Sequence, residues 1–399
     1  MNRLLTLEDL DLDQLEGVPT LVRVDFNVPL AEGRVLDDTR LRAALPTILE
    51  LKSAGARVAL VSHLGRPKGQ VKPEFSLRPV AGALGELLGE PVSFAADCVG
   101  ESARQEIEDL PPGGVCLLEN VRFHPGETAN DPEFAAALAS PVQAYVNDAF
   151  GTAHRAHAST VGVAELIERR AAGRLMVDEV EALGRLLDEP ERPFAAIVGG
   201  AKIDTKVGTV RNLLPRLNLL VLGGGMANTF LAAQGKNLAN SLMEEDKIAV
   251  AREILDEATH RFIRVLLPTD LVVTDNLDNP TRIETVAVDA VPAGTLAVDI
   301  GEASCRAVTE ALAKAKTILW NGPMGVFEKS PFDSGTVAVA AAVGLSSAFT
   351  VVGGGETVAA ARQAGILADL DHVSTGGGAS LEFLAGKALP GIAVLEKRS

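Results

Sequence analysis

The stretch LMVDEVEALGRLL, residues 175–187, divides the chain into two halves with different chemistry. Its apolar side chains recur at intervals of four, three and four residues, the repeat of one helical face: Met176, Val180, Leu183 and Leu187. Pro190 ends the pattern, because proline lacks the amide donor that a helix needs. Predicted strands run into Arg and His residues before this stretch and into glycine triplets after it. We therefore interpret it as a helix that connects two lobes, rather than as an amphipathic helix inside one domain.

Length and net charge limit the kind of protein that this chain forms. At 399 residues it is too long for one comfortable hydrophobic core, so two domains of roughly 150–200 residues are expected. A formal net charge of −16 argues against nucleic acid or an anionic membrane as a partner. A small anionic substrate remains compatible with it, provided that positive charge is gathered locally.

The cysteines and the N-terminal residues predict a cytoplasmic protein. The three cysteines, Cys98, Cys116 and Cys305, have no metal-ligand spacing and suit a reducing compartment. The first residues, MNRLLTLEDLDLDQLEG, lack the apolar core of a signal peptide. Residues 334–355 carry no charge, but the Ala-rich start and the break at 344–347 indicate a buried helix and a strand rather than a membrane span.

Apolar β-branched runs alternate with helical patterns along both halves, which is typical of α/β domains with a parallel sheet. The predicted fold is α/β with two lobes, each a mostly parallel doubly wound sheet flanked by helices, joined by a hinge helix. The expected strands are residues 20–24, 58–62, 92–96, 115–118 and 143–147 in the first half, and 194–198, 219–222, 265–269, 317–320, 349–352 and 372–373 in the second.

Polar residues follow four of the strands in the first half. In open α/β sheets ligands bind beyond the carboxyl ends of the strands, so these residues are expected to converge on one crevice, with Arg40 entering from a helix start. The planar fork of Arg matches carboxylate or phosphate oxygens, so the cluster predicts a site for a small, highly charged anion. The other candidates are Asp25, Phe26, Asn27, His63, Leu64, Gly65, Arg66, Arg122 and Arg155.

Glycine-rich loops follow the strands of the second half. Glycine lets backbone amides approach a phosphate closely, and the start of the next helix favours negative charge. One triplet alone would fit a tight turn, but three triplets with Gly199 and Gly200 favour a phosphate-bearing ligand. Lys202 and Lys206, four residues apart, are expected to face the same way from a helix start, within reach of phosphate oxygens. Glu356, in the third glycine-rich loop, is a candidate ligand for phosphate-bound Mg²⁺.

The usual nucleotide fingerprints are missing, which bears on two alternative functions. There is no GxxxxGK[ST], and Asn228 stands where a GxGxxG after a strand would need its last glycine. This weakens a dehydrogenase with a separate acid-binding lobe. A two-lobed solute-binding protein is the other alternative; it predicts a signal peptide and would not explain cations in one lobe and phosphate loops in the other.

Together these motifs resemble phosphoglycerate kinase, and the resemblance covers nearly all of the chain. The motifs are VRVDFNVP (22–29), DDTR (37–40), SHLGRP (62–67), LENVRF (118–123), NDAFGTAHRAHAST (147–160), GGAKIDTK (199–206), LGGGMANTF (222–230), WNGPMGVFE (320–328), GGGET (353–357) and STGGGASLE (374–382).

The resemblance implies a monomeric, two-lobed glycolytic kinase that moves phosphate between 1,3-bisphosphoglycerate and ADP, with Mg²⁺ carried as MgATP or MgADP. It implies that residues 1–173 bind 3-phosphoglycerate, that residues 174–189 form the hinge helix and that residues 190–388 bind the Mg-nucleotide. Residues 389–399 are implied to return to the N-terminal lobe.

Carried over residue by residue, the resemblance divides the site residues into three groups. It places 3-phosphoglycerate at Asp25, Asn27, Arg40, His63, Leu64, Gly65, Arg66, Arg122 and Arg155. It places the nucleotide at Lys206, Gly301, Glu328, Gly354, Gly355, Glu356 and Thr357. The expected catalytic residues, which meet the transferring phosphoryl group, are Arg40, Lys202, Lys206, Gly377 and Gly378. Many family members carry Asp at the position of Glu356, the implied Mg²⁺ ligand; both carboxylates are hard oxygen donors.

The chemistry of such a reaction agrees with the residues. The acceptor in the reverse direction is a carboxylate, already ionised at neutral pH, so no general base is needed. Catalysis must then come from alignment and from stabilising charge on the phosphoryl oxygens. Neither half holds a complete set of these groups, so closure about residues 175–187 is expected.

Overall fold

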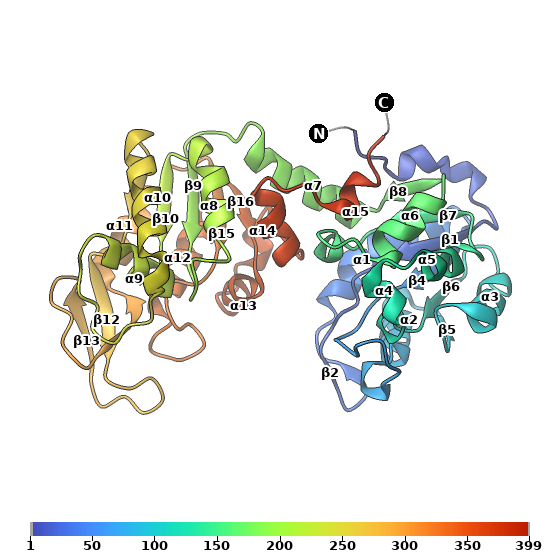
Figure 1. The fold of residues 1–399 in the computed structure, drawn as a ribbon, viewed down its shortest axis with the longest axis horizontal. Coiled ribbons are helices and arrows are strands. Elements are labelled where there is room, and N and C mark those ends of the chain that lie inside the picture. Colours follow the sequence, from blue (N-terminus) through green and yellow to red (C-terminus); the bar gives the residue numbers. More distant parts are fainter. Residues whose placement is uncertain (1–2, 398–399) are drawn as a thin grey trace. The chain divides into compact units, whose positions relative to one another are not determined.

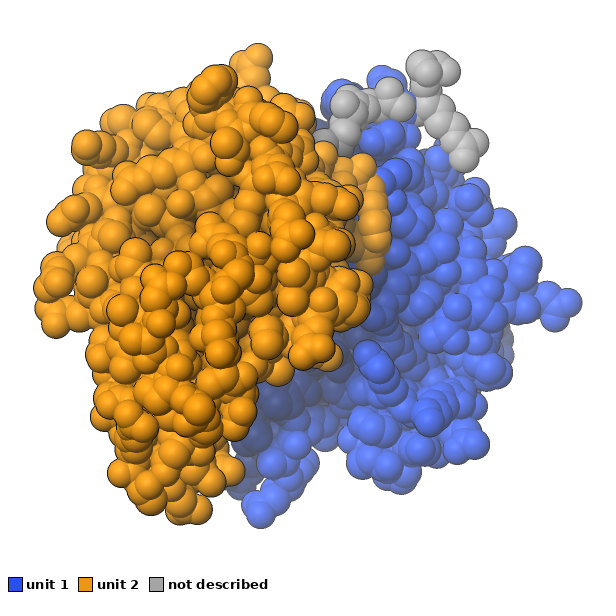
Figure 2. Space-filling view, turned by 60° about the vertical axis from the view of Figure 1, so that its left-hand side comes forward, with its two compact units in different colours: residues 1–181, 388–399 blue, residues 182–387 orange. Residues whose placement is uncertain are grey.

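The computed structural model describes residues 3–397 of a chain that divides into two compact units (Figure 2). Unit 1 consists of Met1–Glu181 and Ala388–Ser399, and unit 2 of Ala182–Lys387. The first division falls inside the helix that the sequence predicts as a connector, rather than at the predicted borders 173/174 and 189/190.

Unit 1 is built on a parallel sheet (Figure 1). Among the described residues this sheet has six strands in the order β5-β6-β4-β1-β7-β8, and neighbouring strands pair in parallel. The chain adds strands on one side of β1 first and on the other side later, which is the doubly wound topology that the sequence predicts. The strands are β1 (Pro19–Arg23), β4 (Arg57–Val61), β5 (Ser93–Ala95), β6 (Val115–Leu118), β7 (Ala144–Asn147) and β8 (Arg170–Ala172).

Helices and short connections complete unit 1. A buried core that includes Val22, Leu60 and Val146 joins the strands to helices such as α1, whose Leu41, Ile48 and Leu51 face it. The helices are α1 (Thr39–Ser53), α2 (Arg78–Leu88), α3 (Gly100–Glu108), α4 (Pro125–Ala129), α5 (Pro132–Ala139), α6 (Val163–Leu166) and α15 (Pro390–Ala393), and a hairpin consists of β2 (Leu30–Ala31) and β3 (Arg34–Val35).

The C-terminal segment is part of unit 1. The Gly391 amide donates to the Ala153 carbonyl at 2.9 Å, and the Leu5 amide donates to the Leu395 carbonyl at 2.9 Å. These bonds hold α15 against the loop that follows β7, so the segment after residue 388 packs with residues far from it in sequence.

Unit 2 repeats the parallel arrangement. Across residues 3–397 its main sheet has six strands in the order β11-β10-β9-β15-β16-β17, with parallel neighbours. The strands are β9 (Phe194–Val198), β10 (Leu219–Leu222), β11 (Arg264–Leu266), β15 (Thr317–Asn321), β16 (Phe349–Val352) and β17 (His372–Val373). The helices are α8 (Val207–Leu213), α9 (Gly224–Ala233), α10 (Ile248–His260), α11 (Glu302–Leu312), α12 (Ser334–Gly344), α13 (Gly355–Gln363) and α14 (Gly378–Leu384).

A second sheet in unit 2 is not predicted from the sequence. Strands β12 (Asp270–Thr274), β13 (Ile283–Ala287) and β14 (Leu296–Ile300) pair antiparallel in the order β13-β12-β14. Asp270, expected to follow the strand 265–269, begins β12 instead, because β11 ends at Leu266. The outer strand β13 has no buried residue, so it lacks the apolar run by which the other strands are recognised.

Helix α7 (Arg174–Leu187) is the helix predicted from residues 175–187. Its first turn is fixed in unit 1, where Arg174 Nε donates to Glu50 Oε2 at 2.7 Å. Its last turns are fixed in unit 2, where the Arg185 guanidinium lies 4.0 Å from the centre of the Phe349 ring and Arg216 donates to the Leu187 carbonyl. The helix is therefore shared between the units rather than separate from both.

The remaining sequence expectations concern boundaries and the membrane. The strands expected at 115–118, 194–198, 219–222, 349–352 and 372–373 have the predicted bounds, and the others differ at one or both ends. Among residues 3–397 no helix combines the length and the apolar character needed to cross a membrane.

Candidate active site

Ionisable side chains, buried or partly buried, gather where β1 and β4 end in unit 1. Arg40, at the start of α1, donates to the Asp25 carboxylate, and His63 Nδ1 lies 3.8 Å from Asp25 Oδ1. Burial disfavours the carboxylate, yet the surrounding positive groups, Arg40 and Arg23 among them, outweigh burial and lower the pKa of Asp25. Burial also lowers the pKa of His63 well below its ordinary value, so the ring is neutral at pH 7. The cluster presents an Arg already oriented by an ionised carboxylate.

Backbone and amide groups extend this cluster. Asn27 Oδ1 accepts the Gly65 amide at 2.8 Å, and Arg122 Nη1 donates to the Gly65 carbonyl at 2.8 Å. Gly65 has φ +61°, and a Cβ there would lie 2.3 Å from the Phe75 ring, so another residue would not fit. Two of the predicted residues, Phe26 and Leu64, have side chains in the core, so their backbone alone is left for a ligand.

A basic cavity of about 540 Å³ lies beside these groups in unit 1. It is lined by the predicted residues Arg66, Arg122 and Arg155 and also by Lys68 and His124. Burial, with the like charges of Arg23 and Arg155, lowers the pKa of Arg122 to about 10. Such crowding of cations would be relieved by an anion, so the cavity has the charge that an anion site needs.

A buried chain of hydrogen bonds leads to the Asp25 cluster. Arg23 Nε donates to Ser159 Oγ at 2.8 Å, and Ser159 Oγ donates to Glu127 Oε1 at 2.7 Å. Arg23 Nη2 lies 3.2 Å from His63 Nδ1, so the chain reaches the Asp25 cluster. All four residues are buried, and Glu127 keeps a lowered pKa although burial opposes its charge. The sequence motifs did not identify Glu127, whose partner Ser159 lies far from it in sequence.

In unit 2 the glycine triplets lead into helix starts. Helix α9 begins at Gly224, α13 at Gly355 and α14 at Gly378. Gly354 (φ +93°) and Gly377 (φ +53°) precede two of these helices and adopt conformations that favour glycine. In α9 the amides of Gly224 and Met226 already donate to the Met324 and Gly200 carbonyls, so the starts of α13 and α14 are better placed to meet an anion.

Lys206 is fixed beside Glu356. Its Nζ donates to the Gly199 carbonyl at 2.6 Å and to the Asn321 carbonyl at 3.1 Å. A Cβ at Gly200 would lie 3.3 Å from this Nζ and 3.9 Å from Glu356 Oε2, so both charges face the same glycine. Burial lowers the pKa of Lys206 to about 8, although the charge of Glu356 opposes this shift.

The predicted placement of the two lysines on a helix start is wrong. Residues 201–203 are irregular, residues 204–206 form a turn, and α8 begins at Val207. Lys202 lies exposed in the irregular part while Lys206 folds back toward β9 and β15, so the two side chains do not share a helix face. The glycines before them and the bond from the Ile203 amide to the Glu244 carboxylate keep this segment out of the helix.

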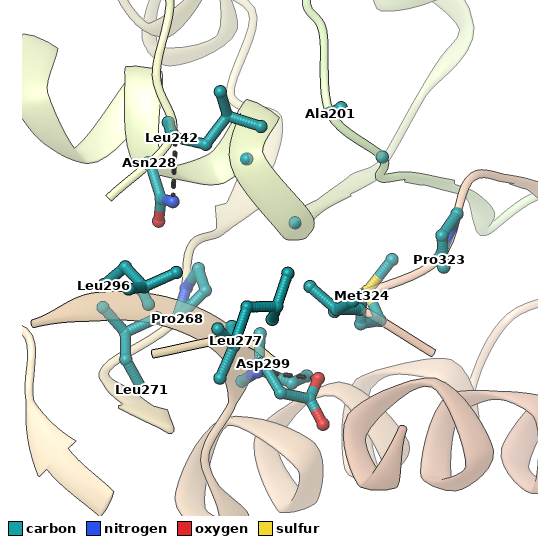
Figure 3. A pocket seen from close by; sticks show the side chains of 18 of the residues that line it. Ala201, Asn228, Leu242, Pro268, Leu271, Leu277, Leu296, Asp299, Pro323 and Met324 are labelled. Carbon is teal, nitrogen blue, oxygen red and sulfur yellow. Dashed lines mark hydrogen bonds between the residues drawn. The ribbon is translucent and has the colours of Figure 1, made fainter. Parts of the chain in front are cut away.

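A cavity of about 230 Å³ in unit 2 has mostly apolar walls (Figure 3). Leu242 and Ala201 lie on one side of it, and Leu271, Leu277 and Leu296 lie on the other. The predicted residues Glu328 and Glu356 line the same cavity.

Asp299 also lines this cavity, but its carboxylate is engaged elsewhere. Asp299 Oδ2 accepts the Gly335 amide of α12 at 2.7 Å, and burial raises the pKa of Asp299 to about 7. Figure 3 shows the carboxylate pointing toward that helix rather than into the cavity.

The other predicted nucleotide residues surround this cavity without lining it. Thr357 Oγ1 accepts the Gly322 amide at 2.6 Å, which ties α13 to the loop after β15. Gly301 packs against Asp270, where a Cβ would lie 2.2 Å from the carboxylate, so the structure gives Gly301 a packing role. The leucines of the wall come from the loops and strands around the antiparallel sheet, which was not predicted from the sequence. Lys68 and His124, in contrast, stand directly beside recognised motifs.

Comparison with known proteins decides the family. The family model described as phosphoglycerate kinase matches residues 7–387. The chain belongs to the phosphoglycerate kinase family. Curated phosphoglycerate kinases of similar sequence include that of Moorella thermoacetica, 54% identical over 394 residues (99% of this chain and 99% of the relative). That of Synechococcus elongatus is 50% identical over 395 residues, 98% of each chain.

Solved structures of phosphoglycerate kinases show the same fold. The structure from Coxiella burnetii has a TM-score of 0.89 at 40% identity and covers 98% of this chain and 99% of its own. The structure from Pyrococcus horikoshii has a TM-score of 0.85 at 35% identity and covers 98% of each chain. These matches extend over both units, so the α/β fold with two parallel sheets is confirmed.

Proposed function

We propose that this protein catalyses reversible phosphoryl transfer between 1,3-bisphosphoglycerate and ADP, giving 3-phosphoglycerate and ATP. Membership of the phosphoglycerate kinase family along nearly the whole chain supports this activity. The observation that carries it is the division of chemistry between the units: an anion site of Arg and His in unit 1, and glycine-led helix starts around an apolar cavity in unit 2.

The acid substrate is assigned to unit 1. The carboxylate and the phosphate of 3-phosphoglycerate match the forks of Arg66, Arg122 and Arg155 in the basic cavity. Asp25 and Asn27 supply acceptors for its hydroxyl group. Arg40, oriented by Asp25, is left to act on the phosphoryl oxygens.

The nucleotide is assigned to unit 2. An apolar cavity walled by leucines suits the flat face of a base, and the helix starts at Gly355 and Gly378 suit phosphates. Glu328 is an acceptor for a ribose hydroxyl. Lys206 adds positive charge beside the glycine loop.

The residues present fit a magnesium ion that arrives with the nucleotide. Glu356 places one carboxylate beside Gly200 and Lys206, and Mg²⁺ typically takes one or two carboxylates together with phosphate oxygens and water. When bound, the ion would neutralise charge on the nucleotide phosphates.

The proposed catalytic groups would act by aligning the substrates and by stabilising charge on the phosphoryl group. The acceptor carboxylate is ionised at neutral pH and needs no base. Arg40, Lys202, Lys206 and the amides at Gly377 and Gly378 would hold the phosphoryl oxygens and stabilise their charge as the phosphorus moves between oxygens. We further infer that the protein acts as a cytoplasmic monomer and that closure about α7 accompanies turnover.

A coupled assay for 1,3-bisphosphoglycerate formation tests the proposal. Turnover should require both 3-phosphoglycerate and MgATP, and calorimetric titration with NADH should show no binding. Binding of NADH without turnover would favour a dehydrogenase, and acid binding without turnover would favour a solute-binding protein.

A further inference from the structure

Three side chains with different donor atoms come together at one edge of unit 1. Asp97 and Cys98 follow β5 and precede α3, whereas His124 lies directly before α4. The carboxylate oxygen, the thiol sulfur and the ring nitrogen of these residues all lie within 4.8 Å of one another. The thiol of Cys98 has no part in the proposed phosphoryl transfer.

We propose that Asp97, Cys98 and His124 bind a zinc ion. Sulfur, nitrogen and oxygen donors together are the set that zinc takes in proteins. A thiolate ligand disfavours magnesium and calcium, which prefer oxygen. The site is therefore chemically distinct from the proposed magnesium position at Glu356 in unit 2.

The three donors are already held in place. The His124 ring stacks on Phe134 with 5.0 Å between ring centres, and its Nε2 lies 2.7 Å from Asp97 Oδ1. The same Asp97 oxygen accepts the Cys98 amide at 2.6 Å. Cys98 is buried, with 2% of its surface exposed, whereas Asp97 and His124 are partly exposed. The buried thiol therefore lies beside two donor groups that solvent reaches.

Only small movements separate this arrangement from a coordinated ion. Zinc–ligand distances of about 2.0–2.3 Å put tetrahedral donors roughly 3.3–3.6 Å apart. Asp97 and His124 would separate by less than about 1 Å from their hydrogen-bonded distance, and the sulfur would approach by at most about 1.5 Å. A hydrogen bond between Asp97 and His124 alone would account for those two residues but not for the sulfur beside them.

The proton balance of binding follows from the ligands. Cys98 releases its thiol proton to solvent and binds as thiolate. In the free protein His124 Nε2 carries the proton that it donates to Asp97, so the ring passes this proton to solvent and takes one up on Nδ1 before Nε2 binds zinc. Zinc binding therefore releases one proton and weakens as the pH falls. Three protein ligands leave one tetrahedral position for water or for an anion from the basic cavity, which His124 also lines.

Cobalt substitution of the full-length protein tests the site directly. Co²⁺ bound through a thiolate gives a sulfur-to-metal charge-transfer absorption, and zinc should abolish this band by displacing the cobalt. Cys98→Ser should remove the band and lower zinc affinity at least about 100-fold, since even changes outside the ligand shell cost 10–100-fold. Cys305→Ser is the matched control, because Cys305 is a partly buried cysteine of unit 2, and it should keep both the band and the affinity.

A second variant keeps the test independent of any folding defect in Cys98→Ser. Asp97→Asn retains the size of the side chain and should weaken zinc binding at least about tenfold. Zinc should also raise the melting temperature of the unmodified protein and of Cys305→Ser, but not that of Cys98→Ser. The proposal is overturned if the unmodified protein gives no charge-transfer band, or if the band survives in Cys98→Ser.

Discussion

Asp148 Oδ1 accepts the backbone amide of Met176 at 3.2 Å, which ties the end of β7 to the first turn of α7. The carboxylate is fully buried, and a Cβ at Gly173 would lie 2.3 Å from the same oxygen. The start of the connecting helix is therefore built around this one side chain, and Gly173 is the residue that leaves room for it. Burial raises the pKa of Asp148 to about 7.

This relationship predicts that Asp148→Asn stabilises the protein at alkaline pH. Between about pH 4 and 7 the folded state holds a proton on Asp148 that the unfolded state has lost, so stability at this site falls as the pH rises through that window. Asn keeps the acceptor for Met176 and cannot ionise. The free energy of unfolding of the variant, measured against that of the unmodified protein, should therefore be roughly 1–3 kcal/mol more favourable to folding at pH 8 than at pH 4.5.

Urea unfolding of both proteins at the two pH values measures this difference. Asp188→Asn removes an exposed carboxyl just after α7 and should show no comparable change with pH. A stability difference between Asp148→Asn and the unmodified protein that is the same at pH 4.5 and pH 8 would contradict the linkage.

Arg40→Ala is predicted to act on the rate rather than on binding. The Asp25 carboxylate orients Arg40 at the anion cluster, and a charge-stabilising group of this kind contributes about 10³-fold or more to kcat. Arg42→Ala is the matched control, because Arg42 lies on the same helix and pairs with Asp38 at the surface. Steady-state kinetics in which only KM rises for Arg40→Ala would indicate uniform binding and remove the assignment.

Lys206 predicts proton uptake when the nucleotide binds. With a pKa of about 8, part of the amine is neutral at pH 8.5, and phosphate oxygens nearby favour the charged form. Titration calorimetry of MgADP binding at pH 8.5, in two buffers of different ionisation enthalpy, measures this proton uptake. Lys206→Met should lose the uptake; unchanged uptake in that variant would point to another group.

The lowered pKa of Lys206 also means that kcat/KM for the nucleotide should fall as the pH rises through about 8.

Glu356 is predicted to act through a metal ion. Glu356→Asp should stay active, because Mg²⁺ keeps waters that absorb the change in side-chain length. Glu356→Gln keeps the shape but loses the charge, and it should weaken MgADP binding more than binding of metal-free ADP. Equal weakening of the two nucleotide forms, measured by titration, would show that the carboxylate does not contact the metal.

The sequence predicts those parts of the fold and site that depend on local pattern. The strands with apolar runs and the helix starts after glycine triplets can be predicted from the sequence, because a few adjacent residues are enough to recognise each of them. In the antiparallel sheet, strand β13 is missed because it has no buried residue. The placement of Lys202 and Lys206 fails because Lys206 is held by the Gly199 and Asn321 carbonyls, a contact across sequence-distant strands. The buried Glu127–Ser159 bond is missed for the same reason.

The last prediction concerns closure about α7. The anion cluster belongs to unit 1 and the glycine-led helix starts belong to unit 2. Under the proposed function the acid binds to the first and the nucleotide to the second, so neither unit by itself would contain a complete reaction centre. Phosphoryl transfer needs reacting atoms roughly 3–3.5 Å apart with water largely excluded. A permanently closed protein would block the exchange of charged substrates, so the two substrates together should favour a closed state.

Small-angle scattering measures this change, because a ligand shifts such an equilibrium only by its differential affinity for the two states. The radius of gyration should drop clearly with 3-phosphoglycerate plus a nucleotide, and less with either ligand alone. The flanks of α7, near residues 171–173 and 188–190, are where we expect the backbone to rotate. A ternary complex that scatters like the ligand-free protein would show that α7 is a fixed connector, and catalysis would then need another way to exclude water.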